Sequence, residues 1–125
     1  MKLNNSFILK KAVCEASKSK HKHKVSAVIF DKKRIFSIGR NYPSKSVKHL
    51  KNKFKKWNSS IHAEVDAIIK AKRDLRGMSM LIVRVSKSGL ALAKPCKFCL
   101  EYLNHVGIKT IYYSNEKGDI ERLNK

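Results

Sequence analysis

The sequence has few acidic residues, few cysteines and no long apolar run. Of its 125 residues, 9 are Asp or Glu and 29 are Lys or Arg, which gives a formal net charge of +20. A charge this one-sided indicates attraction to phosphate, carried either by a nucleic acid or by a nucleotide. An AT-rich coding bias would explain many lysines, but it would not explain so few acids.

No apolar run approaches the roughly 18 residues of a membrane span, so we expect no membrane partner. The N-terminal stretch MKLNNSFILKKAVCEASKSK has lysines among its apolar residues at helical spacing, which is typical of an amphipathic helix rather than a signal peptide. Without an export signal we expect a cytoplasmic protein. The chain has no repeat, low-complexity block or linker, so we expect one domain over residues 1–125.

The three cysteines are too few for a four-cysteine zinc site built from this chain alone. Cys14 stands far from the others in sequence, and we interpret it as a packed thiol of the first helix. Cys96 and Cys99 form a C-x-x-C pair after Pro95. In the reducing cytoplasm such a pair is more often metal-binding or catalytic than a disulfide, and any further ligand must be of another type.

The pattern of apolar residues predicts alternating helices and strands, and therefore a layered α/β domain with a mixed sheet. In chain order we expect a helix capped by Ser6, a hairpin of strands 25–30 and 35–39, a helix over 61–72, a strand over 78–85, a short return over 90–93, a helix over 96–106, a strand over 108–114 and a short edge strand or turn over 118–123.

Helical spacing also predicts which side chains are buried. In the first helix these are Phe7, Leu9, Val13 and Ala16. The helix over 61–72 is expected to have Ser59 or Ser60 as its cap and an apolar side of Ile61, Val65, Ile68 and Ile69. The long basic loop between residues 40 and 60 is expected to contain a short helix around 47–54.

His62 is the best candidate for the missing ligand. His62, Cys96 and Cys99 supply one nitrogen and two sulfurs, a set that suits Zn²⁺. Each lies at a predicted helix start, where the positive helix end stabilises thiolates. Three protein ligands leave the fourth tetrahedral position open, as in a catalytic zinc site. Glu64 is close enough to exchange a proton with water there and to pass it to a leaving amine.

The motifs HAE (His62 to Glu64) and PCKFC (Pro95 to Cys99) follow the H-x-E…P-C-x-x-C signature of zinc deaminases. Across nearly its whole length the chain resembles the cytidine deaminase-like superfamily, in particular the branch with deoxycytidylate, tRNA adenosine and polynucleotide-editing deaminases. The resemblance implies a three-layer α/β/α sandwich with a mixed sheet of about five strands, a Zn²⁺ cofactor, and attack at C4 of cytosine or C6 of adenine, with cytosine favoured.

The resemblance also implies substrate-binding residues. Asn41, in GRNY, matches a position that contacts the nucleoside, although a loop Asn can equally cap or turn the backbone. Ala63 lies within the HAE motif. Tyr112 and Tyr113 alternate along a strand, so their rings should face opposite sides, and Tyr113 precedes a loop that borders the pocket in this superfamily. The added segments of deoxycytidylate deaminases and the Ser-Trp-Ser pattern of vertebrate editing enzymes are both missing, so no subfamily is assigned.

The stretch from Lys32 to Ala63 has ten Lys or Arg and no acid. The affinity for a polynucleotide backbone rises with the number of such charges that contact its phosphates. Aromatic residues in a basic groove hold single strands by stacking on the bases. The residues predicted to bind nucleic acid are Lys45, Lys48, Lys51, Lys53, Lys55, Lys56 and Trp57. Trp57 could instead pack the loop onto the body of the domain.

Three functions are therefore open. The favoured one is a zinc-dependent hydrolytic deaminase that acts on a base in single-stranded or looped DNA or RNA. The second is a deaminase of a free (deoxy)cytidine nucleotide, and the third is a nucleic-acid-binding module with a structural zinc. Glu64 argues against the third, because a structural site has no use for that carboxylate. An oligomer is compatible with each of them.

Overall fold

The computed structural model describes residues 7–19, 24–32, 34–43, 60–95 and 97–123. Its elements are α1 (Phe7–Ser17), β1 (Lys24–Asp31), β2 (Arg34–Arg40), β3 (Tyr42–Pro43), β4 (Ser60–Ile61), α2 (Ala63–Ala71), β5 (Ser79–Ser86), β6 (Gly89–Ala91), α3 (Lys97–Val106), β7 (Thr110–Ser114) and β8 (Ile120–Arg122). This order confirms the predicted alternation, including the short return at β6 and the edge strand at β8.

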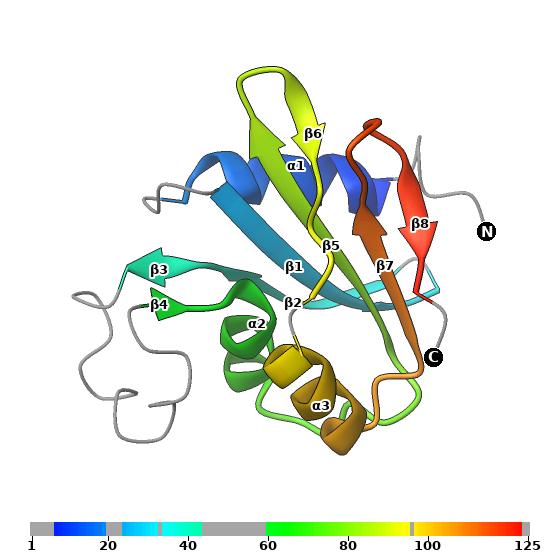
Figure 1. Cartoon of the computed structure of the whole chain (residues 1–125). Helices are drawn as coiled ribbons and strands as arrows, with labels where there is room; N and C mark the ends of the chain where they lie inside the picture. The colour runs from blue at the N-terminus through cyan, green and yellow to red at the C-terminus, as the bar shows by residue number, and fades with distance from the viewer. Residues whose placement is uncertain (1–6, 20–23, 33, 44–59, 96, 124–125) are drawn as a thin grey trace.

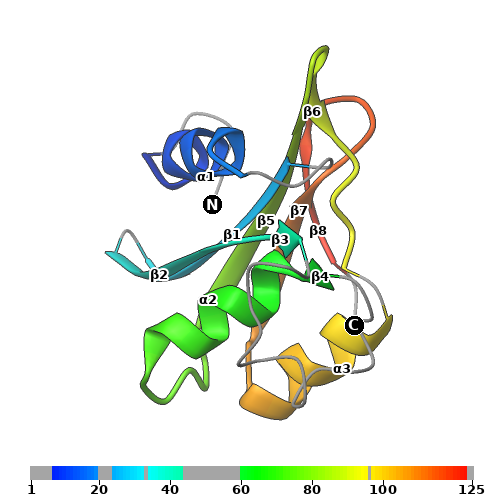
Figure 2. The ribbon, with the colours of Figure 1, turned by 90° about the vertical axis from the view of Figure 1, so that its left-hand side faces the viewer.

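Six of these strands form one mixed sheet, in the order β2-β1-β5-β7-β8 with β6 paired to β5. β1 is antiparallel to both β2 and β5, whereas β5 and β7 are parallel. A parallel pair needs a crossover, which the chain makes through α3. Helix α1 covers one face of the sheet, and α2 and α3 lie on the other (Figure 1 and Figure 2). The three-layer α/β/α arrangement with a mixed sheet is therefore confirmed.

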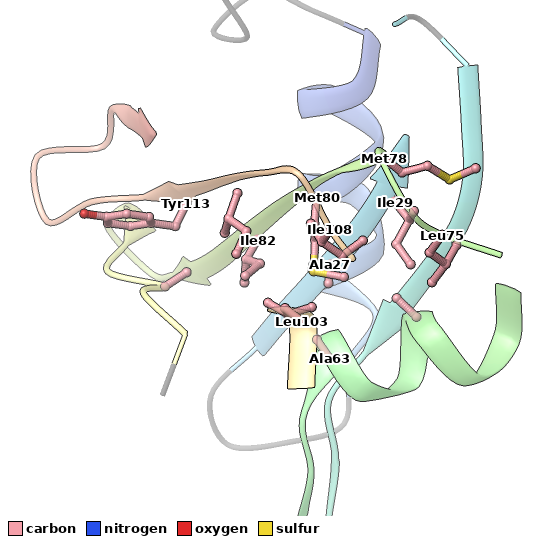
Figure 3. Packing of buried hydrophobic residues seen from close by; sticks show 13 residues of the cluster. Ala27, Ile29, Ala63, Leu75, Met78, Met80, Ile82, Leu103, Ile108 and Tyr113 are labelled. Atoms are coloured by element: carbon pink, nitrogen blue, oxygen red, sulfur yellow. The ribbon is translucent and has the colours of Figure 1, made fainter. Parts of the chain in front are cut away.

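Each face of the sheet has its own apolar cluster, because neighbouring strand residues point to opposite sides. Figure 3 shows the cluster on the side of α2 and α3, where Met80, Ile82 and Leu103 pack together and Tyr113 lies at one end. On the α1 side the buried residues are Ile8, Leu9, Ala12, Ala16, Val28, Phe30, Leu81 and Val83. Tyr112 packs on this second side, so the predicted alternation of the two tyrosines is confirmed.

The predicted buried face of α1 is confirmed for Leu9 and Ala16, and Val13 packs against the same cluster, but Phe7 was wrong. The buried residues of the helix are Ile8, Leu9, Ala12 and Ala16, whereas Phe7 is 68% exposed. Cys14 is exposed, so the interpretation of a packed thiol was wrong. The reason is helical geometry: position 14 lies about 200° around the axis from Ala12, at 100° per residue, and therefore faces away from the sheet. None of the described helices is both long and apolar enough to cross a membrane.

The start of α2 also differs from the prediction of a serine cap. Ser60 and Ile61 pair with Pro43 and Tyr42 as strands β4 and β3. The helix therefore begins at Ala63, and His62 is its N-cap, with extended backbone angles and no capping hydrogen bond from its side chain. The start of α2 is decided by the pairing of two segments far apart in sequence. This pairing cannot be predicted from the local pattern of residues.

Helix α2 packs directly on the backbone of β2 at Gly39. A Cβ atom at Gly39 would lie 2.3 Å from the carbonyl oxygen of Ala63 and 2.3 Å from the backbone nitrogen of Ala67. Beside this contact, the Ser37 hydroxyl donates a hydrogen bond of 2.7 Å to the Ala67 carbonyl. Gly39 therefore sets how closely the helix that begins beside His62 can approach the sheet.

Gly39→Ala is expected to lower the free energy of unfolding by at least about 1–3 kcal/mol, because the new methyl group would collide with helix backbone, which cannot rotate away as a side chain can. Urea unfolding followed by circular dichroism measures this. Ser37→Ala is the control: it removes one hydrogen bond at the same contact, adds no atom and should cost about 1 kcal/mol. A Gly39→Ala protein as stable as its parent would contradict the close contact.

Candidate metal centre

Three potential ligands from two helices converge on one point. His62 precedes α2, Glu64 is in its first turn, and Cys99 is in the first turn of α3. The Nδ1 atom of His62 lies 3.0 Å from the Sγ atom of Cys99. The ligand atoms of all three residues lie within 4.8 Å of one another. A nitrogen and a sulfur donor at this spacing fit a zinc ion.

The centre is largely shielded from solvent. Cys99 is fully buried and Glu64 is 5% exposed, while His62 is half-buried. Burial raises the pKa of the Glu64 carboxyl. A backbone hydrogen bond, the charge of His62 and a hydrogen bond with Cys99 act in the opposite direction without cancelling this effect. A raised pKa makes a carboxyl group a better proton acceptor than an ordinary carboxylate, which suits a general acid–base group.

Cys96, predicted as the third zinc ligand, lies outside the described residues. Pro95 on one side of it is buried, and α3 begins at Lys97 on the other. Of the predicted ligand set, the structure therefore brings His62 and Cys99 together. The position of Cys96, directly before a helix whose first turn carries Cys99, is compatible with the prediction, which stays a prediction.

Ser114 holds the segment that leads into α3. Its hydroxyl donates a hydrogen bond of 2.6 Å to the carbonyl of Ala91 and accepts one of 3.1 Å from the backbone N–H of Arg84. The Ala93 N–H donates to the Ser114 carbonyl at 2.9 Å. Sequence reasoning missed this role. The sequence signal for this role was a serine at the end of an apolar strand. In the structure this serine is fully buried.

Asp66 is a second residue whose role was missed. Its buried carboxylate accepts a hydrogen bond of 3.0 Å from the backbone N–H of Arg40 and forms an ion pair of 2.9 Å with Lys70. It therefore ties α2 to the end of β2, next to Asn41. An acid two residues after Glu64 on a buried helix face was the signal that could have revealed it.

Asn41 is buried and has a structural role. Its Oδ1 atom accepts hydrogen bonds from the backbone N–H of Val25 at 3.0 Å and from the Ser19 hydroxyl at 2.7 Å. These bonds connect the end of α1, the start of β1 and the end of β2. Asn41 thus fixes the backbone, as the alternative interpretation of a loop asparagine anticipated.

The other two substrate candidates lie on the same face of the sheet as the metal centre. Ala63 and Tyr113 belong to one apolar cluster and are 1% and 9% exposed. Tyr113 also borders an open pocket of about 520 Å³, lined further by Leu92, Asn115, Glu116, Lys117, Asp119 and Glu121. His62, Glu64 and Cys99 are not among the residues that line this pocket, so the role of the loop after Tyr113 at the substrate pocket stays a prediction.

The predicted nucleic-acid-binding residues lie outside the described residues. They are Lys45, Lys48, Lys51, Lys53, Lys55, Lys56 and Trp57, together with the short helix expected around 47–54. The described part of the chain resumes at β4, directly before His62. The basic segment is therefore adjacent in sequence to the metal centre.

Comparisons with known proteins agree with this geometry. The model of the cytidine and deoxycytidylate deaminase zinc-binding region matches residues 3–115. The apo dCMP deaminase from the cyanophage S-TIM5 is 25% identical with a TM-score of 0.60, over 87% of this chain and 80% of that one. A cytidine deaminase from Burkholderia pseudomallei shares the fold, with 18% identity and a TM-score of 0.65 over 94% and 89% of the two chains. A comparison with curated protein sequences gives no match.

Proposed function

Because the chain belongs to the family of the cytidine and deoxycytidylate deaminase zinc-binding region, we propose that it is a zinc-dependent hydrolase that converts a cytosine base to uracil. The observation that carries this proposal is the convergence of His62, Glu64 and Cys99 within 4.8 Å. The donor types fit zinc, and a buried carboxyl lies beside them. A module with a purely structural zinc would have no use for Glu64.

His62, Cys96 and Cys99 would hold the zinc. When bound, zinc acts as a Lewis acid that makes water nucleophilic near neutral pH. Glu64 accepts a proton from the attacking water and delivers it to the departing amino group. A bond forms between the water oxygen and C4 of cytosine, the bond from C4 to the exocyclic amino nitrogen breaks, and ammonia leaves. The second proton of the water goes to ring N3, which gives uracil. Burial around Glu64 keeps bulk water from competing for that proton.

Asn41, Ala63 and Tyr113 are the proposed contacts to the nucleoside. Tyr113 is supported by its place in the apolar cluster that also contains Ala63. Ala63 is supported by its place between His62 and Glu64, at the start of α2. For Asn41 the support is its location at the end of β2, which Asp66 ties to α2 through the neighbouring Arg40. Because Asn41 also fixes the backbone, a mutation there would affect stability as well as substrate affinity.

For the substrate, we place single-stranded or looped nucleic acid first. Its support is the net charge of +20 and the acid-free basic stretch that leads into His62. The second candidate is a free (deoxy)cytidine nucleotide, supported by the 25% identity with a cyanophage dCMP deaminase. This chain covers 80% of that enzyme. A lack of long added segments therefore does not count against the second candidate.

Ammonia release distinguishes the two substrates. Zinc-loaded protein is incubated with dCMP, with CMP and with single-stranded oligonucleotides that contain one cytosine. If ammonia is released from the oligonucleotides at lower substrate concentrations than from the mononucleotides, the first candidate is supported. If ammonia is released from the mononucleotides alone, the second is supported. If zinc-loaded, folded protein releases ammonia from none of these substrates, the deaminase proposal is wrong.

Replacing Lys51, Lys53, Lys55 and Lys56 with Gln should weaken binding to a single strand and flatten its salt dependence. If each lysine contacts one phosphate, the slope of log affinity against log salt should fall by about 3, since each contact on a single strand contributes roughly 0.7. Fluorescence anisotropy at several salt concentrations measures this slope. The control replaces Lys10, Lys11, Lys87 and Lys109 with Gln. Equal slopes for parent and test variant would mean that the basic segment does not bind the strand.

A further inference from the structure

Two arginines from different elements share one aromatic ring at the edge of the sheet. Phe36 lies on β2, an edge strand. The Cζ atom of Arg73, which follows α2, lies 4.3 Å from the centre of its ring, and the Cζ atom of Arg34, which begins β2, lies 5.3 Å from it. Cation–π contacts at these distances hold guanidinium groups in place. A guanidinium held over a ring can still offer its N–H edge to a phosphate.

The surroundings of this ring are strongly basic. Lys32, at the tip of the β1–β2 hairpin, and Lys72, at the end of α2, are both exposed. We call Lys32, Arg34, Phe36, Lys72 and Arg73 the Phe36 platform. Neither of its arginines forms an ion pair with any other described residue.

Two acids lie close to the Phe36 platform. Asp31 faces Arg34 across the hairpin. Asp74 is engaged by Arg76, whose guanidinium lies 2.7 Å from its carboxylate and lowers its pKa to about 2. The four cations of the platform therefore exceed the acids around them, and the surface is suited to an anionic partner.

We propose that the Phe36 platform binds the phosphate backbone of a single-stranded nucleic acid whose target base lies in the metal centre. Guanidinium groups match phosphate oxygens in pairs, and two of them fixed by one ring lose little freedom on binding. A nucleic acid fits better than an acidic protein, because the site on the same helix belongs to a family that acts on nucleotides.

The length of α2 relates this surface to the metal centre. His62 lies at the start of the helix and Arg73 just after its end, and the 9 residues of α2 span about 14 Å at 1.5 Å per residue. A single nucleotide is too short to span this distance, so only a strand of several nucleotides can occupy both the metal centre and the Phe36 platform.

This inference rests on the first substrate candidate of the proposed function, but binding alone tests it. The probe is a fluorescent single strand of about 16 nucleotides, the upper site size of a single-strand-binding fold. Anisotropy is measured at several salt concentrations for a variant with Arg34→Gln and Arg73→Gln. The expected result is weaker binding and a salt slope lower by about 1.4, which is two phosphate contacts.

Two further variants separate the platform from bulk charge. Lys10→Gln with Lys87→Gln removes the same charge from α1 and from the β5–β6 turn, and its slope should stay at the parent value. Phe36→Leu keeps every charge and leaves an apolar side chain in the cluster. Any weaker binding by this variant is therefore due to loss of the ring that holds the two guanidinium groups. Circular dichroism and zinc content establish that each variant is folded.

Strand length supplies the last comparison. With a labelled mononucleotide in place of the strand, the arginine variant should bind as the parent does, because one nucleotide in the metal centre cannot reach the Phe36 platform. An unchanged salt slope in the arginine variant overturns the proposal, as does an equal loss in the lysine control. Displacement of the strand by polyglutamate at equal charge overturns the choice of partner. Ammonia release by the parent protein tests the deaminase separately, so the two failures are distinguishable.

Discussion

Replacing Glu64 with glutamine is expected to lower turnover by about 10²–10⁴-fold, with fold and zinc content unchanged. Glutamine has nearly the same shape but cannot accept or release a proton. Among the described residues of the metal centre, Glu64 supplies the only carboxyl group, and it is 5% exposed. Burial raises its pKa, which suits a group that must take up a proton and return it within one reaction cycle.

The measurement is ammonia release by zinc-loaded protein, on whichever substrate the parent accepts. The matched control is Glu101→Gln, the same change at an exposed position of α3. This control should retain parent turnover. A Glu64→Gln protein that keeps its zinc and turns over at the parent rate would show that another group moves the proton.

Cys99→Ala is expected to remove zinc and activity together. Cys99 is fully buried, and its sulfur lies 3.0 Å from Nδ1 of His62. Without this thiolate the predicted ligand set loses one of its three protein donors, and a buried cavity replaces the sulfur. Zinc content should fall from about one per chain to background after dialysis against a chelator, and turnover should fall in parallel.

The chain contains its own control for this experiment. Cys14→Ala removes an exposed thiol from α1, on the opposite face of the sheet. Its zinc content should equal that of the parent. Full zinc retention by Cys99→Ala under the same dialysis would rule out Cys99 as a ligand, and equal zinc loss in both variants would indicate nonspecific thiol binding.

Local signals in the sequence were sufficient for most of the fold. The apolar runs around Val28 and Ile82 indicate buried strands, and Gly107 ends α3 with a positive φ of 88°. The start of α2 was wrong because a strand pairing between residues 42–43 and 60–61 decides it. The predictions for Phe7 and Cys14 were wrong because both side chains are exposed, and only packing on the sheet decides which side of α1 is covered.

The same division applies to the site. His62, Glu64 and Cys99 could be found from sequence because each lies in a short motif at a helix start. For Ser114 and Asp66 the sequence could at most indicate a polar residue on an apolar strand or helix face, because their roles depend on hydrogen bonds to backbone groups brought near by the fold. A hydroxyl or carboxyl group in the sequence does not reveal which distant N–H or carbonyl it will meet.

The placement of His62 and Cys99 on different helices gives the metal a role in folding. The two residues are 37 positions apart in the chain, and they meet only when α2 and α3 are packed side by side. One ion bound to both residues would cross-link them and close a loop of that length. A covalent cross-link that closes such a loop stabilises a protein by about 4 kcal/mol. The apo chain should therefore melt at a lower temperature, so zinc supply would govern the lifetime of the protein as well as its turnover.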